Sequence, residues 1–315
     1  YQFGFFNPYF TVDGISQGYN IGYAERNAGA VNIANYSTDI FNAGINFGIP
    51  LNEFDQIRFD TDIKHTTLKT NNCDTYGADY INYNCNYTSE QIRQFTREEG
   101  TKFWTFGQAV SWSHDTLNRA IFPNKGGQQR LSGLVMIPGS DLEYYKVGYR
   151  HQHYFPLAKD FTFKLNGEVA YGGGYGNTNG LPFFENYFMG GTGSVRGFKN
   201  NTLGPRDSNG RPIGGSSKII ANAELFFPVP FLSETKSVRL GTFFDAGALN
   251  DSFSVDGMKY SAGISGEWLS PFGALSVSAA YPLNKGTFTY VDSNNQNVTG
   301  NDETQYFQFN FGQNF

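Results

Sequence analysis

Alternation of apolar and polar residues with a period of two is the feature that most restricts how this chain can fold. Residues 41–49 read FNAGINFGI, so Phe, Ala or Ile stands at each odd position and Asn or Gly at each even position. Residues 15–24 and 57–64 alternate in a similar way. Such a pattern gives a strand one apolar and one polar face, and no helical period of comparable quality occurs. The sequence therefore predicts an all-β fold.

The alternating runs divide into about 13 strands, and the connections between them differ in length. The predicted strands cover residues 1–10, 15–25, 36–49, 56–68, 101–118, 128–138, 143–156, 161–174, 216–228, 237–249, 259–269, 274–283 and 303–315. Short connections such as TVDG at 11–14 and SPFG at 270–273 fall at one end of the strands. The long connections at 69–100, 175–215 and 284–302 fall at the other end. Short turns on one side and long loops on the other are typical of a transmembrane antiparallel β-barrel.

The composition fits a membrane barrel better than a soluble β-sandwich. No run of about 18 apolar residues could form a transmembrane helix, but a barrel strand needs only every second residue to be apolar. Aromatic residues make up 17% of the chain, and several stand near predicted strand ends, among them Tyr36, Trp104, Tyr260, Trp268 and Tyr281. Amphipathic rings favour the two headgroup zones of a membrane. The net charge of −5 gives no indication of nucleic-acid binding.

Cys73 and Cys85 predict one disulfide. Both lie in the long connection 69–100, within a segment rich in Asn, Tyr and Asp. Paired cysteines in a polar loop indicate an oxidising compartment. Two thiols without a neighbouring His cannot complete a zinc site.

The histidines do not form a catalytic or metal-binding pattern. His151 and His153 share one strand face, but a third ligand is not obvious, and their parity places them outward near a short turn. His114 and Asp115 point to opposite faces of a strand, which is wrong for a catalytic dyad. We therefore expect no enzyme activity, no cofactor and no metal.

The connection 175–215 contains the most unusual stretch of the chain, FFENYFMGGTGSVRGF at residues 183–198. Its glycines indicate backbone conformations that other residues avoid. Arg196 is a single cation between apolar and glycine residues, and such a cation favours a carboxylate partner. A phosphate-binding loop is the wrong interpretation, because no Gly-Lys-Ser or Gly-Lys-Thr follows.

Four stretches together resemble the BamA family of outer-membrane assembly factors. They are NPYFTVDG at 7–14, IPGSDLEYYKV at 137–147, GGTGSVRGF at 190–198 and FQFNFGQNF at 307–315. The resemblance runs along the whole chain and is most specific at Val195, Arg196, Gly197 and Phe198. It implies a 16-stranded barrel preceded by five POTRA domains. Aligned by NPYFTVDG, the chain would begin in the fourth strand, so residues 1–315 are expected to be a single, N-terminally incomplete barrel domain.

The resemblance also implies where the loop goes. In the family, the loop with the VRGF sequence folds into the lumen and its arginine meets carboxylates of the inner wall, so residues 175–215 are expected to be a lumen loop. Alternation places Glu224 with Asn222 on a polar strand face, and it places Asp245 on the polar face of the next strand. We predict that Arg196, Glu224 and Asp245 form one cluster that pins the loop, since a guanidinium can bind two carboxylates. The alternative is a solvated loop cation.

The last strand resembles the C-terminal β-signal by which outer-membrane barrels are recognised for assembly. Its expected members are Phe307, Phe309, Phe311, Gly312 and Phe315. The resemblance implies that this strand forms one side of an opening seam, where Gly312 would weaken strand pairing. An exposed strand edge is a template for an incoming strand. The alternative is a lipid-facing closing strand with no further role.

The function implied by the resemblance is the folding and insertion of β-barrel proteins into the outer membrane of a Gram-negative bacterium, through a lateral seam. The implied partners are unfolded outer-membrane barrel proteins, assembly lipoproteins that bind POTRA domains, periplasmic chaperones and the lipid bilayer, without nucleic acid. Two related barrels are alternatives because they also carry a VRGF-like loop: a TamA-like translocase and a two-partner secretion transporter. A passive pore is a further alternative.

Overall fold

The computed structural model describes residues 1–70, 88–229, 237–271, 273–292 and 294–311. Cys73 and Cys85, which are predicted to form a disulfide, lie outside these residues. Gly312 and Phe315 of the predicted seam strand also lie outside them.

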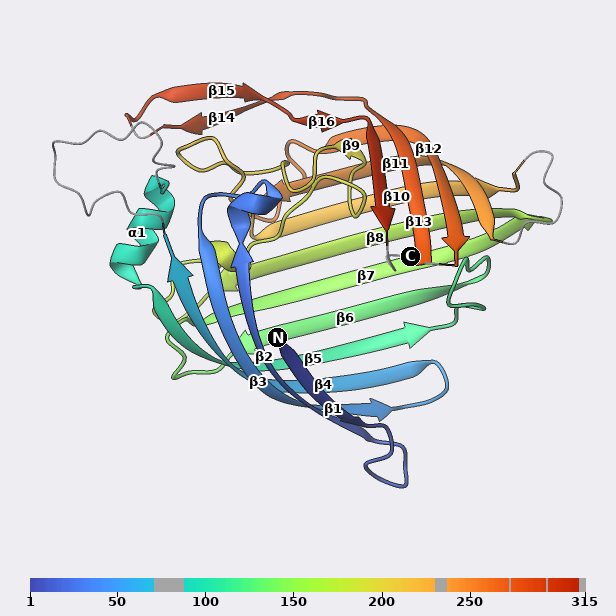
Figure 1. The fold of residues 1–315 in the computed structure, drawn as a ribbon, viewed down its shortest axis with the longest axis horizontal. Coiled ribbons are helices and arrows are strands. Elements are labelled where there is room, and N and C mark those ends of the chain that lie inside the picture. The colour runs from blue at the N-terminus through green and yellow to red at the C-terminus, as the bar shows by residue number, and fades with distance from the viewer. Residues whose placement is uncertain (71–87, 230–236, 272, 293, 312–315) are drawn as a thin grey trace.

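Thirteen antiparallel strands form one curved sheet that wraps around an interior filled by loops (Figure 1). In spatial order the strands are β1 (Gln2–Asn7), β2 (Ser16–Asn27), β3 (Ser37–Pro50), β4 (Asp55–Lys69), β5 (Lys102–Asp115), β6 (Gly126–Met136), β7 (Tyr144–Ala158), β8 (Phe161–Gly174), β10 (Ser217–Phe227), β11 (Val238–Asn250), β12 (Lys259–Ser270), β13 (Gly273–Pro282) and β17 (Phe307–Phe311). Each predicted strand overlaps one of these, so the predicted all-β class is confirmed.

The two faces of the sheet have opposite character. Large apolar side chains are exposed on the outer face, for example Ile21, Ile63, Val147, Val169, Ile264 and Val277. Polar side chains are buried on the inner face, for example Thr66, Gln152, Glu224, Asp245, Ser265 and Gln308. A soluble sandwich packs its apolar faces inward, whereas a membrane barrel turns them outward to lipid. The inverted arrangement is therefore that of a membrane barrel, and the interior of the curved sheet is its lumen.

The long connections gather at one end of the sheet and contain small elements that the alternation did not predict. These are the 3-10 helices η1 (Ala28–Val31) and η2 (Phe183–Glu185), the helix α1 (Glu90–Glu98), the hairpin of β14 (Thr287–Val291) and β15 (Asn297–Asn301), and the short pair β9 (Gly197–Phe198) and β16 (Thr304–Gln305). Figure 1 shows the β14–β15 hairpin across the top of the molecule. Among the described residues no helix has both the length and the apolar character needed to cross a membrane.

The aromatic start of the loop packs inside the sheet. Phe183 and Phe184 contact Phe95 of α1, with ring centroids 5.2 and 5.9 Å apart. Tyr36 packs against Phe183 with a centroid distance of 4.9 Å. The expectation that Tyr36 lies at the membrane interface is therefore wrong, because its ring joins an interior apolar cluster. This cluster fixes the first half of the loop inside the lumen.

Candidate functional site: the arginine cluster of the lumen loop

A tight glycine turn presents the VRGF residues to the inner wall. Gly190 and Gly191 have φ angles of +113° and +90°, which L-residues with a Cβ rarely adopt. A Cβ at Gly190 would also overlap the carbonyl oxygen of Lys199. The turn is closed by the hydroxyl of Ser194, which accepts a hydrogen bond of 2.8 Å from the Gly190 N–H. The glycines are therefore needed for the loop to reverse direction before Arg196.

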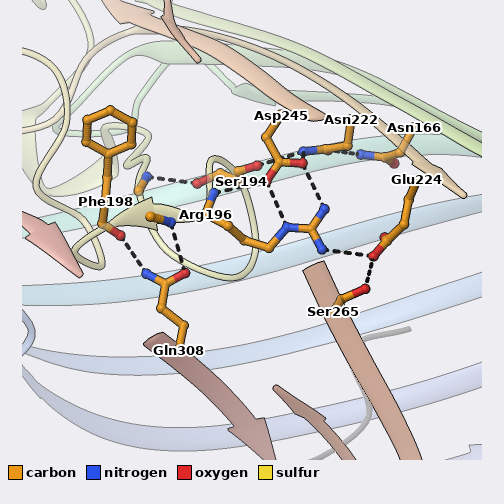
Figure 2. Close-up of polar contacts among 11 residues, drawn as sticks. Asn166, Ser194, Arg196, Phe198, Asn222, Glu224, Asp245, Ser265 and Gln308 are labelled. Atoms are coloured by element: carbon orange, nitrogen blue, oxygen red, sulfur yellow. Dashed lines mark hydrogen bonds and ion pairs between the residues drawn. The ribbon is translucent and has the colours of Figure 1, made fainter. Parts of the chain in front are cut away.

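Arg196 binds carboxylates on two neighbouring strands (Figure 2). Its Nε and Nη2 atoms donate to Oδ2 and Oδ1 of Asp245, each at 2.8 Å, and its Nη1 donates to Oε1 of Glu224 at 3.0 Å. The backbone N–H of Arg196 also donates to Oδ2 of Asp245 at 3.0 Å. The structure thus brings together the three residues predicted from the sequence. The exposed fractions of their side chains are 12% for Arg196, 6% for Glu224 and 0% for Asp245.

Neutral polar groups hold the two carboxylates in place. Asn222 donates from Nδ2 to Oδ1 of Asp245 and to the carbonyl oxygen of Ser194, both at 2.8 Å. Ser265 on β12 donates to Oε1 of Glu224 at 2.6 Å. The network therefore extends over β10, β11 and β12. Its neutral hydrogen bonds orient both carboxylates independently of Arg196.

The guanidinium of Arg196 also lies over an aromatic ring. Its Cζ atom is 3.3 Å from the ring centroid of Phe243, which faces the lumen two residues before Asp245. Burial lowers the pKa of Arg196, but the hydrogen bonds and charges of Asp245 and Glu224 outweigh this effect, so the pKa is raised above its ordinary value. Arg196 is therefore permanently charged. A cavity of about 370 Å³ lies beside it, lined in part by Arg150, Lys164 and Glu267.

The other VRGF residues have separate roles. Val195 and Phe198 are fully buried in an apolar cluster with Met189, Leu203, Ile220 and Leu249. Gly197 has a φ angle of +88°, and an added Cβ would lie 3.2 Å from the Cβ of Ala280 on β13. Val195 and Phe198 thus pack the segment into the apolar cluster, and Gly197 allows close approach to the wall. Arg196 binds the wall by charge.

A second ion cluster holds the first half of the loop, and sequence reasoning missed it. Glu185 lies with its Oε1 2.5 Å from the Nζ of Lys64 on β4, and its carbonyl oxygen accepts a hydrogen bond of 2.7 Å from Lys146 on β7. Burial raises the pKa of Glu185, but the charges of Lys64 and Lys146 outweigh it, so the pKa is lowered. The signal was present in the sequence, since Glu185 is the one acid within the aromatic stretch FFENYF.

The last strand has an apolar outer face and one deeply buried inner residue. Phe307, Phe309 and Phe311 point outward and are 75%, 73% and 57% exposed. Gln308 points inward and is 4% exposed. The described part of β17 pairs with β13 through five residue pairs, from Leu275 with Phe311 to Ala279 with Phe307. The alternating face predicted for this strand is thus present for the described residues.

Comparison with known proteins places the chain in a family. The Omp85 superfamily domain matches residues 1–315. This chain belongs to the Omp85 superfamily. It is 34% identical to the outer membrane protein assembly factor BamA of Neisseria meningitidis serogroup B in an alignment of 350 residues. The alignment covers 99% of this chain and 41% of that protein. The resemblance to BamA predicted from the sequence is therefore confirmed, and the chain spans about two fifths of that relative.

Solved structures show the same barrel fold. BamA from Haemophilus ducreyi lacking POTRA domains 1–3 superimposes with a TM-score of 0.80 at 26% identity, covering 98% of this chain and 60% of that one. CdiB from Acinetobacter baumannii superimposes with a TM-score of 0.51 at 13% identity, covering 94% of this chain and 47% of that one. The likeness to CdiB shows the fold alone.

The histidines of this Omp85 chain have structural partners. Nδ1 of His114 lies 3.0 Å from Oδ1 of Asp55, and the same oxygen accepts a hydrogen bond of 3.0 Å from the indole N–H of Trp112. His151 and His153 contact each other at a centroid distance of 6.0 Å. In the described part of the chain, no three His, Cys, Asp or Glu residues come together as a metal-binding group.

Proposed function

We propose that this chain is the membrane barrel of an outer-membrane protein assembly factor, located in the outer membrane of a Gram-negative bacterium. The similarity to BamA, which covers 99% of the chain, supports this proposal. The observation that carries it is the outer face of β17. The described residues of this strand pair with β13, and the side chains of Phe307, Phe309 and Phe311 are exposed on the outer face.

The proposed mechanism is pairing of strands, without bond chemistry or a cofactor. A strand edge presents N–H and C=O groups in a row, and these can pair with the backbone of another chain. β17 would offer such an edge to a strand of an unfolded barrel protein. Its exposed phenylalanines face outward, so a strand added beside β17 would continue the apolar face into the bilayer. The new barrel strand would then be inserted as it pairs.

The wider partners follow from the same proposal. The substrates would be unfolded outer-membrane barrel proteins, delivered by periplasmic chaperones. The related Haemophilus structure is of a BamA lacking POTRA domains 1–3, and we expect that POTRA domains in the whole protein would bind assembly lipoproteins. Within the chain, residues 1–315 would form one barrel domain around the lumen loop 175–215.

Reconstitution tests the proposed function against its alternatives. The full-length protein that contains this chain would be inserted into lipid vesicles and mixed with an unfolded outer-membrane barrel protein. We expect the substrate to fold into the membrane faster than in vesicles without the protein, measured as a heat-modifiable shift in gel mobility. A TamA-like translocase or a secretion transporter would instead move substrate into the vesicle interior, and a passive pore would only release a trapped dye. An unchanged folding rate would contradict the proposal.

A further inference from the structure

Gln308 connects the last strand to the lumen loop. Its Nε2 donates a hydrogen bond of 2.6 Å to the carbonyl oxygen of Phe198, and its Oε1 accepts one of 3.3 Å from the N–H of Gly197 (Figure 2). A glutamine amide has both a donor and an acceptor, so it can pair with an N–H and a C=O of the same segment. Because the residue is 4% exposed, losing these partners would leave a buried amide unpaired.

The residues just before β17 bind the same segment through the backbone. Thr304 and Gln305 of β16 pair with Phe198 and Gly197 of β9. The N–H of Lys199 donates to the carbonyl oxygen of Glu303 at 3.0 Å, and their side chains form an ion pair of 2.9 Å. Residues 303–305 and the side chain of Gln308 are thus bonded to residues 197–199.

The loop replaces a strand partner where the ladder with β13 ends. The ladder between β13 and β17 stops at Ala279 and Phe307, and beyond it the N–H of Ala280 donates to the carbonyl oxygen of Tyr306 at 2.8 Å. From that point toward the long loops, β9 pairs with the chain instead. Arg196, which directly precedes β9, is bound to β10 and β11. A four-residue segment therefore joins β10 and β11 to the last strand.

We propose that the lumen loop is a clamp on β17, with Gln308 as the positioning residue that couples the arginine cluster to this strand. The inference rests on the proposed function in one respect, since β17 would be the strand that pairs with substrate. Movement of β17 away from β13 breaks the bonds of Gln308 to the loop. Conversely, release of Arg196 from Asp245 frees the segment that holds β17. The strength of the clamp thus sets how readily this edge of the barrel moves.

Hydrogen exchange of the full-length protein in lipid nanodiscs tests the clamp. Gln308→Leu removes both side-chain bonds at similar size. The matched control is Asn310→Leu, because Asn310 also faces the lumen from β17 and lines the cavity beside Arg196. We expect Gln308→Leu to accelerate exchange of the Gly197, Phe198 and Lys199 amides roughly tenfold, as two lost hydrogen bonds would, and Asn310→Leu to leave them unchanged.

A second variant tests whether a change at Arg196 is transmitted to β17, which a local effect of the Gln308 substitution would not show. Arg196→Lys keeps the charge but loses the forked geometry. Among the described residues, the Arg196 side chain bonds to β10 and β11 and not to β17. We expect this variant to accelerate exchange of the Phe307 and Phe309 amides, while those of Ile63 in β4 keep the wild-type rate. Equal exchange in wild type and Gln308→Leu at residues 197–199, or no change in β17 for Arg196→Lys, would overturn the proposal.

A second variant at Gln308 and the absence of substrate complete the exchange experiment. If Gln308→Leu fails to fold, Gln308→Met replaces it, because methionine has nearly the length of glutamine and lacks the amide donor and acceptor that bind Phe198 and Gly197. A similar acceleration is then expected, and wild-type exchange would count against the clamp. The exchange experiment contains no substrate protein. A clamp that passes it while vesicles show no assembly would therefore stand, and the proposed function alone would fail.

Discussion

Replacing Arg196 with alanine should release the lumen loop. The change leaves the carboxylates of Asp245 and Glu224, which are 0% and 6% exposed, without their counter-charge. Removing one partner of a buried ion pair costs about 3–5 kcal/mol, and the lost contact with the Phe243 ring adds up to about 2 kcal/mol. Water in the neighbouring cavity would solvate the stranded acids in part. We therefore expect about 3 kcal/mol, which is roughly a hundredfold increase in the open state of the loop.

The assay is hydrogen exchange and trypsin cleavage of the loop in the membrane-embedded, full-length protein. The matched control is Lys199→Ala, a second cation of the same loop whose side chain and whose partner Glu303 are 42% and 44% exposed. An exposed pair of this kind contributes about 0–1 kcal/mol. Adding Asp245→Asn and Glu224→Gln to Arg196→Ala should recover part of the loss, because the stranded charges are then removed. If Arg196→Ala had no larger effect than Lys199→Ala, the buried ion cluster would not hold the loop.

The remaining predictions concern the second anchor, the glycine turn and the cysteines. Because the charges of Lys64 and Lys146 lower the pKa of Glu185 below its ordinary 4.5, its stabilisation is complete above about pH 4.5 and is lost as the pH falls through the folded value. Glu185→Gln should therefore lower the Tm at pH 7, with a difference from wild type that shrinks below pH 4.5; a difference independent of pH would exclude this origin. Gly190→Ala should destabilise the turn by about 1–3 kcal/mol because of its positive φ, whereas Gly193→Ala, whose Cβ would meet nothing within 4 Å, should be tolerated in the same thermal unfolding measurement. Cys73 and Cys85 should give a cross-linked peptide by mass spectrometry without reductant, and free thiols would contradict the disulfide.

The strands could be predicted because their burial pattern is local. Each inward residue is two positions from the next, so residues such as Asn222, Glu224 and Asp245 were assigned to the lumen face without knowledge of their neighbours. The helix α1 could not be predicted in this way. Its Ile92 and Phe95 pack against the interior cluster that contains Phe183, so its stability depends on tertiary contacts with a distant part of the chain.

Of the two ion clusters that hold the loop, the Arg196 cluster was predictable from the sequence and the Glu185 cluster was not. Arg196 and its acids were identified through the resemblance and the strand parity. Glu185 could be singled out as an isolated acid, but its partner Lys64 lies 121 residues away in sequence, and alternation does not say which strands face each other across the lumen. Gln308 is buried on the inner face of β17, and its partners are backbone groups of the loop, which no side-chain pattern encodes.

The measurement that most directly tests strand pairing at β17 is site-specific cross-linking during substrate folding. A photo-reactive amino acid would replace Phe309 in β17. In a matched variant it would replace Ile63, an outward and exposed residue of β4, which pairs with β3 and β5. An unfolded outer-membrane barrel protein would then be folded by the full-length protein in vesicles. We expect cross-links from position 309 to the substrate's strands and background labelling from position 63. Equal labelling at the two positions would contradict strand pairing at β17.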